Sequence, residues 1–567
     1  MMRIHRKIRL KKLALVMVSM GLSLTLAACG GSSDAKAGSN QKKETNSVAP
    51  VGKDMLVVGN LGEVPTLDPG KWNDNTSLRV LHDLFEGLVG ENQADEVVPA
   101  VATSWDESKD GLTYTFYLRK DAKWSNGEPV TAEDFVYAFK RNIDPTVGAQ
   151  QIDVFRPIAN GEAIIDGKKP ADSLGVMALD SHTLQIKLDY AYPFFIDTLT
   201  NPVTYPLYKP VLDRWGDGWA QPGHMVSNGA YELKSWIVNG SLLEQKNPHY
   251  WDAKRVKIDK VKFLPVNPQA EYSQFLSGQI DMTNTVPSGV TKAQFEQKFG
   301  REFYNIPMLG TYYYWFNIKK PGVDKVDVRK ALTMVVDRKA IVNSITRLGQ
   351  LPLYGIMPIN IENGSYKDLY KQLPSYDWVD WSMDKRIDKA KKLLIKSGYS
   401  AEHPLDIKIS FNTLEGHKMI AEAVAQMWQK AFGNLVAVTL YNEEWKVYLQ
   451  SLRDGNFQVG RMGGIATLNA ANNFLDGLTC NHPANYSRFC DKQFDRYYQD
   501  GMHAVSLSEY NKNMIVATKI AMNDYVQIPI YNYTYSRLVK NYVGGYHPEK
   551  NYMDDVYSKW LYFKKAN

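Results

Sequence analysis

Two cysteines ten residues apart have the most definite chemistry in this sequence. Cys480 and Cys490 enclose a loop, CNHPANYSRFC, that contains Pro483 and Asn485. In an exported protein this spacing predicts a local disulfide. A metal site is the alternative, because His482 lies between the two cysteines, but the spacing matches no zinc pattern.

A second stretch, residues 457–477 (FQVGRMGGIATLNAANNFLDG), carries no charge between Arg461 and Asp476. It consists largely of Gly, Ala, Asn and Thr. Phe457, Val459 and the glycines after them predict a strand that runs into an open turn, because glycine lets a backbone approach another group closely. That group is either another strand, which would make the stretch a packing corner, or a ligand.

The sequence lacks the usual signatures of an enzyme. It has no G-x-S-x-G, no H-E-x-x-H, no phosphate loop and no C-x-x-C motif. The acidic pairs at 443–444 and 554–555 are expected to be solvated, because neighbours in sequence rarely share a face. His224 and His417 are expected to be surface or structural residues. The pattern favours a binding protein without a cofactor over a hydrolase.

The N-terminus has the features of a lipoprotein signal. Six basic residues up to Lys12 precede an apolar run at 13–28, which ends in Leu26-Ala27-Ala28-Cys29. Residues 1–28 therefore predict a signal peptide and Cys29 a lipidated new N-terminus, with an ordinary secretory signal as the alternative. Residues 29–53 are rich in Gly, Ser, Lys and Asn, and predict a flexible tether to the cell envelope, on the periplasmic face or the outer face of the cell membrane.

The charge of the mature chain is balanced. The formal charge of +6 comes from the signal, and the chain after it holds 61 basic and 61 acidic residues. A chain without excess positive charge lacks the electrostatic driving force for nucleic-acid binding, so no nucleic-acid partner is expected.

The rest of the chain alternates between predicted strands and helices. Strands are expected at 55–60, 113–118, 182–188, 226–236, 241–246, 260–265, 311–318, 405–412, 436–440, 457–461 and 527–535. Helices are expected at 77–88, from 131, and at 193–199, 271–277, 328–343, 384–397, 418–432, 445–453 and 510–524. The alternation between about 310 and 530 is typical of a doubly wound α/β lobe. Ligands of such lobes bind outside the strand carboxyl ends, where residues 457–477 are expected to lie.

Seven blocks, in order along the chain, resemble the oligopeptide-binding proteins of peptide ABC importers, within the family 5 extracellular solute-binding proteins. The first, LRKDAKWSNGEPVTAEDFVYAFKR at 118–141, is specific to the family. The others are NPVTYPL (201–207), SNGAYELKSW (227–236), SGQIDMTN (277–284), TYYYWFN (311–317), EEWKVYL (443–449) and RLVKNYVGGY (537–546).

The resemblance implies an α/β, two-lobed periplasmic-binding-protein fold with an extra α+β domain on the first lobe. Ligand lobe I would comprise 54–77, 207–309 and 536–567. The extra domain would span 78–206, and ligand lobe II 310–535.

The resemblance also implies a mechanism and a set of site residues. An extended peptide would lie between the lobes, pair with backbone as an added strand does, and be enclosed by lobe closure for recognition by permease subunits. Family positions that line the cleft correspond to Asn284, Tyr314, Trp445 and Arg461. Cations that meet peptide carboxylates correspond to Lys320, His417 and Arg453. Gly463 and Thr467 would lie in the site floor.

Three departures from the family pattern concern this floor. The family's aspartate for the peptide ammonium corresponds to Thr467, a cysteine pair to Gly310 and Ile465, and an aromatic residue to Gly464. Threonine cannot neutralise an ammonium group, and a lost charge partner in a closed site costs several kcal/mol. The chain is thus expected to bind N-blocked or otherwise modified peptides, or a different solute.

The leading interpretation is a monomeric, lipid-anchored solute-binding protein that captures oligopeptides for an ABC importer. One alternative is the same fold with a non-peptide solute, such as a murein fragment, a small glycan or a metal chelate. The other is a receptor or adhesin that feeds no transporter.

Overall fold

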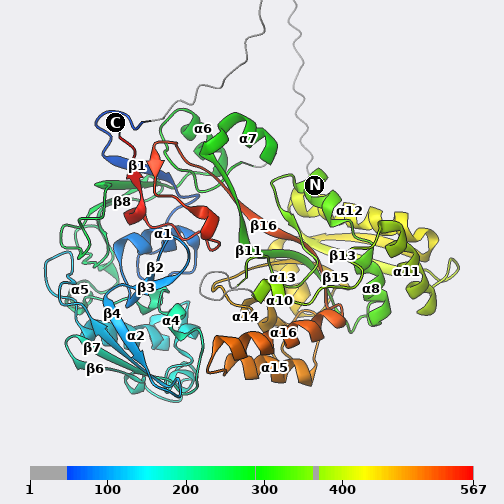
Figure 1. Cartoon of the computed structure of the whole chain (residues 1–567), viewed down its shortest axis with the longest axis horizontal. Coiled ribbons are helices and arrows are strands. Elements are labelled where there is room, and N and C mark those ends of the chain that lie inside the picture. Colours follow the sequence, from blue (N-terminus) through cyan, green and yellow to red (C-terminus); the bar gives the residue numbers. More distant parts are fainter. Residues whose placement is uncertain (1–47, 288, 362–368, 566–567) are drawn as a thin grey trace, which may run out of the picture. The chain divides into compact units, whose positions relative to one another are not determined.

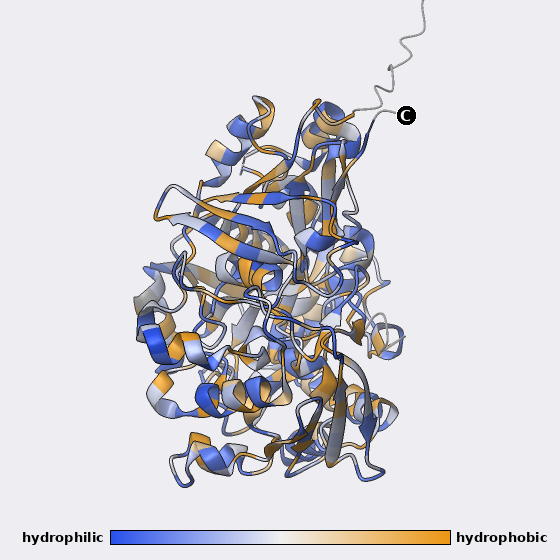
Figure 2. Ribbon diagram, turned by 90° about the vertical axis from the view of Figure 1, so that its left-hand side faces the viewer, coloured by the Kyte–Doolittle hydropathy of each residue, from blue (hydrophilic) through white to orange (hydrophobic). Residues whose placement is uncertain are grey.

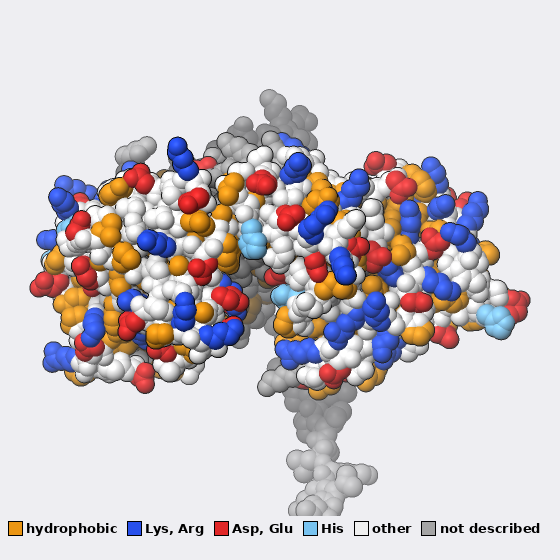
Figure 3. All heavy atoms as spheres, turned by 90° about the horizontal axis from the view of Figure 1, so that it is seen from below, with side chains coloured by type: hydrophobic (Ala, Val, Ile, Leu, Met, Phe, Trp, Pro, Cys, Tyr) orange, Lys and Arg blue, Asp and Glu red, His pale blue; other side chains and the backbone are white. Residues whose placement is uncertain are grey.

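The computed structural model describes residues 48–287, 289–361 and 369–565. The predicted signal peptide and Cys29 lie outside these residues. The described part of the chain contains no helix that is long and apolar enough to cross a membrane. Over the face shown in Figure 3, Lys and Arg side chains are interspersed with Asp and Glu side chains, without one large field of a single sign.

The strands form three main sheets. The first has the order β1-β10-β9-β8, the second β4-β5-β7-β6 and the third β12-β16-β11-β15-β13-β14. Two small pairs, β2–β3 and β17–β18, complete the set. The strand bounds are β1 Met55–Gly59, β2 Val89–Glu91, β3 Val97–Pro99, β4 Ala102–Glu107, β5 Thr113–Leu118, β6 Val176–Asp180, β7 Thr183–Lys187, β8 Tyr231–Ile237, β9 Ser241–Lys246, β10 Lys260–Leu264, β11 Phe303–Phe316, β12 Leu351–Pro352, β13 Leu405–Asn412, β14 Val436–Glu443, β15 Val459–Ile465, β16 Gln527–Leu538, β17 Val543–Gly544 and β18 Tyr562–Phe563.

Helices connect these strands, as Figure 1 shows. The helix bounds are α1 Asn75–Leu84, α2 Ala132–Ile143, α3 Gly161–Ile165, α4 Phe195–Thr198, α5 Lys209–Trp215, α6 Pro268–Leu276, α7 Lys292–Phe299, α8 Val326–Met334, α9 Arg338–Ala340, α10 Leu369–Gln372, α11 Met383–Lys396, α12 Glu415–Phe432, α13 Trp445–Arg453, α14 Asn472–Leu475, α15 Lys492–Met502 and α16 Leu507–Asn523.

Local signals account for several of these elements. The Thr131 N-cap of α2 forms the predicted capping box, in which Asp134 Oδ2 accepts from the Thr131 amide at 2.8 Å. The β8–β9 hairpin turns at Asn239, whose φ of 57° is the left-handed conformation that Asn-Gly turns supply. Strands β5 and β13 and helix α13 have the predicted bounds.

The predicted helix at 328–343 is interrupted. Helix α8 ends at Met334, and the chain continues through α9 into a π-helical turn, Ile341–Thr346. The reason is Arg338, which is fully buried and donates to the carbonyls of Val336, Leu353 and Pro529 at 2.7–3.0 Å. A buried guanidinium must be hydrogen-bonded, so it recruits carbonyls from this break.

Strand β11 is longer than predicted and begins at Phe303. Its pairing with β16 shifts register between Pro307 and Thr311. Proline has no amide hydrogen to donate, and such residues are accommodated where a ladder is interrupted.

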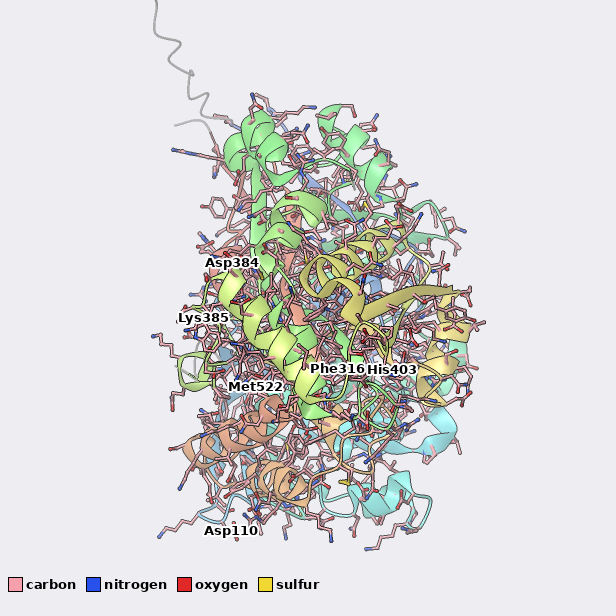
Figure 4. All side chains as sticks on the ribbon, turned by 90° about the vertical axis from the view of Figure 1, so that its right-hand side faces the viewer. Asp110, Phe316, Asp384, Lys385, His403 and Met522 are labelled. Carbon is pink, nitrogen blue, oxygen red and sulfur yellow. A yellow bond between two sulfur atoms is a disulfide. The ribbon has the colours of Figure 1, made fainter. Side chains whose placement is uncertain are left out.

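Two large cores hold the elements together. One lies around the third sheet and includes Phe316, Trp378 and Met522. Figure 4 views this region, with Asp384 and Lys385 at the start of α11 and Phe316 and Met522 in the interior. The other core joins the first and second sheets, with Phe135 and Phe263 as members of one cluster. Figure 2 shows the corresponding mixture of hydrophobic and hydrophilic positions along the ribbon.

A pair of carboxyl groups lies inside the second core. Asp83 of α1 and Glu244 of β9 are both fully buried. The Ser558 amide donates to Asp83 Oδ1 at 2.8 Å. Burial, the charge of Asp83 and a hydrogen bond to Asp83 raise the pKa of Glu244 well above its ordinary value, and burial raises the pKa of Asp83 to about 6. Both carboxyl groups are therefore expected to keep their protons to a higher pH than exposed carboxyl groups do.

A disulfide joins Cys480 to Cys490. It closes the loop between α14 and α15. His482 within that loop accepts from the Ala484 amide through Nδ1, at 3.1 Å. Among the described residues, no group of three or more His, Cys, Asp or Glu side chains could hold a metal ion.

Candidate functional site

The third sheet brings three strand ends to one edge. Strand β13 pairs in parallel with both β14 and β15, so their carboxyl ends lie together. Strand β15 was expected to end at Arg461 but continues to Ile465, because Gly463 and Gly464 pair with Tyr312 and Thr311 of β11. The glycines therefore belong to the strand, not to the loop.

Arg461 is the buried cation at this edge. Its side chain is 8% exposed, and its guanidinium lies 4.6 Å from the Tyr312 ring centroid. One terminal nitrogen donates to Tyr533 Oη at 3.1 Å and the other to Asn412 Oδ1 at 3.3 Å, while Nε has no partner. These partners are neutral, and no described carboxylate forms an ion pair with Arg461. Since a buried charge normally has a counter-charge, the arrangement fits an anionic ligand group.

Three tyrosines hold the guanidinium in place. Tyr312 stacks on Tyr531 with ring centroids 4.8 Å apart, and Tyr531 meets Tyr533 edge-on at 5.4 Å. Tyr531 and Tyr533 alternate along β16, while Tyr312 comes from β11. The two long strands therefore place an aromatic wall around Arg461.

His417, at the start of α12, lies beside this wall. Its Nδ1 is 3.3 Å from Tyr312 Oη. Burial and the charge of Arg461 lower the pKa of His417 to about 3. In the ligand-free protein both effects therefore favour the uncharged imidazole, and a cationic role for His417 toward a peptide carboxylate stays a prediction.

Gly463 is required by the position of Tyr533. A Cβ atom on Gly463 would lie 2.5 Å from Tyr533 Oη and 3.3 Å from the Thr311 carbonyl oxygen. Only a residue without a side chain allows Tyr533 to reach Arg461 across the strand.

We expect Gly463→Ala to lower the free energy of unfolding by about 1–3 kcal/mol, because Tyr533 must move away from the added methyl group. Thermal unfolding measures this loss. Gly464→Ala is the matched control, since its Cβ would meet only Tyr313 Oη, at 3.9 Å. Equal loss of stability in both variants would contradict the assignment.

Strand β15 also has a free edge. It pairs with β13 only at Val459 and Gly460, whereas β11 accompanies it to Ile465. The Ala466 amide donates to the Leu309 carbonyl of β11. Along an antiparallel strand, backbone groups point alternately toward and away from the neighbouring strand. The backbone groups of residues 461, 463 and 465 therefore point away from β11. The Arg461 carbonyl accordingly accepts from Tyr448 Oη at 2.6 Å. In the described chain, no strand pairs with this side at 463 and 465.

Two of four further predicted site residues, Lys320 and Arg453, lie away from Arg461. Tyr314 is fully buried behind Tyr312, and Trp445 is 40% exposed at the start of α13. Arg453 is exposed at the far end of α13, where its carbonyl accepts from Arg488. Lys320 follows the end of β11 that pairs with Val459. Because β11 and α13 both run toward the amino end of β15, Lys320 and Arg453 are not grouped with Arg461.

Thr467 is exposed just beyond β15. Its amide and hydroxyl both donate to Asn473 Oδ1, at 3.0 and 3.1 Å. The hydroxyl is therefore held by a neutral amide. Gly310 and Ile465 are direct cross-strand partners, as cysteines at these positions would need to be.

Asn284 belongs to a second cluster, farther along β16. Its Oδ1 accepts from Tyr535 Oη at 3.1 Å, and its carbonyl from Arg537 Nε at 3.3 Å. Arg537 forms an ion pair with Asp554 at 2.8 Å. Asp554 is 11% and Asp555 17% exposed, so the prediction that this acidic pair is solvated is wrong. Backbone folding around Asn551, which bonds the Asp555 amide and carbonyl, buries both.

Sequence reasoning missed Asn412, Tyr312, Tyr531 and Tyr533. The alternating tyrosines in TYYYWFN and PIYNYTY were the available signal, since residues two apart in a strand share a face.

Comparison with known proteins identifies the family. Residues 96–486 match the family model described as bacterial extracellular solute-binding proteins, family 5 Middle. The chain is 37% identical to the periplasmic oligopeptide-binding protein OppA of Escherichia coli, over 90% of this chain and 93% of that protein. It is 38% identical to the periplasmic murein peptide-binding protein MppA of Escherichia coli, over 89% and 92%.

Solved structures agree with these matches. The unliganded open form of the murein tripeptide-binding protein MppA superposes with a TM-score of 0.80 at 37% identity, covering 91% of this chain and 98% of that one. Haemophilus influenzae OppA in complex with RPPGFSPFR gives 0.72 at 34%, covering 92% and 100%. The chain therefore belongs to the family 5 bacterial extracellular solute-binding proteins and has their two-lobed fold.

Proposed function

We propose that this protein is the solute-binding component of a peptide ABC importer, which captures oligopeptides in extended form and delivers them to a membrane permease. Relatives named for oligopeptide and murein peptide binding, each covering about nine-tenths of the chain, support this proposal. A lipid on Cys29 would tether it to the cell envelope, and it would act as a monomer.

The observation that carries the proposal is the free edge of β15 beside Arg461. An extended peptide that adds to this edge would pair with the backbone of residues 463 and 465, independently of its sequence. Its terminal carboxylate would meet the Arg461 guanidinium, whose present partners are all neutral. A charge-assisted bond of this kind is stronger than a neutral one.

Native mass spectrometry of protein purified without denaturation tests the proposal. We expect bound species with peptide masses that are released on unfolding. A retained glycan, metal chelate or other non-peptide solute would overturn it.

The boundaries between the two ligand lobes are also proposed to lie at 309/310 and 535/536. Boundaries at 309/310 and 535/536 fall inside β11 and β16, next to the register shift between Pro307 and Thr311. A pair of strands with an interrupted ladder is a suitable place for lobes to rotate.

A second candidate ligand is a peptide without a free N-terminal ammonium. Thr467 and Asn473 form a neutral pair at the end of β15, and the chain carries no charge between Arg461 and Asp476. An ammonium group placed there would lose its hydration without gaining a counter-charge.

We expect one tripeptide to bind at least as tightly after N-acetylation as before it, because the site supplies no carboxylate for the ammonium. Calorimetric titration of the two forms measures the difference. The variant Thr467→Asp should reverse the order in favour of the free peptide. Strong binding of the free form without binding of the acetylated form to the wild type would exclude this candidate.

A further inference from the structure

Three large apolar side chains are exposed at the carboxyl ends of three strands of the third sheet. Leu414 follows β13, Trp445 follows β14 and Ile465 ends β15; they are 57%, 40% and 61% exposed. Single exposed apolar residues are ordinary, but a group at the carboxyl ends of three parallel strands lies where α/β sheets bind ligands.

Backbone and side-chain contacts connect these three positions to the Arg461 site. Arg461 donates to Asn412, two residues before Leu414. The Thr413 amide donates to the Glu443 carbonyl at 2.8 Å, which joins the end of β13 to the end of β14. Ile465 lies four residues beyond Arg461 in the same strand. The apolar group therefore lies at the same edge of the sheet as Arg461.

On the side of Arg461 this group meets neutral residues, while Glu415 follows Leu414 and Glu443 and Glu444 precede Trp445 in the chain. His417, three residues after Leu414, has its pKa lowered to about 3 by burial and by Arg461. The partners of Arg461 are the buried Tyr312 and the partly buried Tyr533 and Asn412. A ligand would thus meet one buried cation, neutral hydrogen-bonding groups and exposed apolar surface, and would gain most from a carboxylate next to apolar side chains.

We infer that Leu414, Trp445 and Ile465 determine specificity, giving the site a preference for peptides whose residues next to the C-terminal carboxylate carry large apolar side chains. The inference rests on the proposed peptide-binding function and adds the chemical class of peptide to it. Successive side chains of an added strand point to opposite faces of the sheet. Two neighbouring ligand residues would therefore contact different members of the group.

Two near-isosteric peptides test the inference by calorimetry. Ala-Leu-Leu and Ala-Asn-Asn have side chains of similar size that differ in polarity, and each is measured both with a free and with an acetylated N-terminus. We expect the wild type to bind the leucine peptide about tenfold or more tightly than the asparagine peptide, in whichever form binds. Burial of one leucine side chain suffices for such a ratio.

Ile465→Asn and Leu414→Asn are expected to reduce the ratio to about twofold or less, mainly by weakening the binding of the leucine peptide. Both residues are exposed, so neither change should unfold the protein. Val505→Asn, a similarly exposed residue between α15 and α16, is the control and should keep the wild-type ratio.

The outcomes separate the inference from the function on which it rests. If the wild type binds both peptides equally, or if the Asn variants lower both affinities by the same factor, the apolar group does not select ligands and the inference is overturned. If the wild type binds no peptide in either form, the proposed function itself fails.

Discussion

Replacement of Arg461 by methionine is expected to weaken the binding of peptides with a free C-terminal carboxylate by roughly 30-fold to several thousand-fold. Loss of one partner of a buried, hydrogen-bonded charge pair costs roughly 2–5 kcal/mol. Arg461 is 8% exposed, and its described partners are Tyr312, Tyr533 and Asn412, none of which can replace the positive charge.

A thermodynamic cycle with a C-terminally amidated peptide isolates the effect. The wild type should lose a comparable factor on amidation, whereas Arg461→Met should bind the acid and the amide equally. Arg461→Lys keeps the positive charge but loses the planar guanidinium with its two parallel donors. Its preference for the acid over the amide should lie between those of the wild type and Arg461→Met. Lys408→Met removes a cation of β13 that packs on Tyr441, and should leave both affinities unchanged.

The prediction for Arg461 would fail if the methionine variant still distinguished the acid from the amide by the wild-type factor. Thermal unfolding of each variant shows whether the protein remains folded. Since the tyrosine wall packs on the guanidinium, a modest decrease in stability is expected even for a correctly folded variant.

The carboxyl pair Asp83–Glu244 is expected to make the protein less stable as the pH rises. In the unfolded chain both carboxyls lose their protons near pH 4. In the folded protein, burial raises the pKa of Asp83 to about 6, and burial together with the charge of Asp83 raises the pKa of Glu244 well above its ordinary value. The folded state therefore binds protons more tightly. This contribution is fully present at low pH and is lost as the pH rises through the raised values.

Glu244→Gln should remove much of this dependence. The amide keeps the shape and can still donate to Asp83, but it does not titrate in this range. Relative to the wild type, the variant should gain up to about 1.4 kcal/mol in free energy of unfolding for each pH unit above the unfolded pKa, until the raised pKa is passed.

Calorimetric unfolding between pH 5 and pH 9 measures this difference. Arg79, whose charge lowers the pKa of Asp83, has its own pKa lowered by burial only to about 10, so it stays positive across most of this range and adds little to the slope. Glu232→Gln on β8 is the matched control, because Glu232 pairs with Lys234 at a partly exposed position. Parallel pH profiles for the wild type and Glu244→Gln would show that the pair does not retain a proton.

Local patterns predicted many elements well. The capping box at Thr131, the Asn239 hairpin, strand β13 and helix α13 all depend on residues close in sequence, and all have the expected form. The predictions failed where distant groups intervene. Arg338 interrupts a helix because it needs carbonyls from 353 and 529, and β15 extends to Ile465 because β11 lies beside its glycines.

The candidate site shows the same division. The amino-acid sequence alone shows that an uncharged, glycine-rich stretch follows Arg461, that two cysteines lie ten residues apart, and that no common catalytic motif is present. The folded structure was needed to show that Arg461 is buried among neutral groups, that burial lowers the pKa of His417, and that Asp554 is paired with Arg537. A side chain's type is local, but its burial, its pKa and its partners depend on strands more than a hundred residues apart in the chain, which only folding brings together.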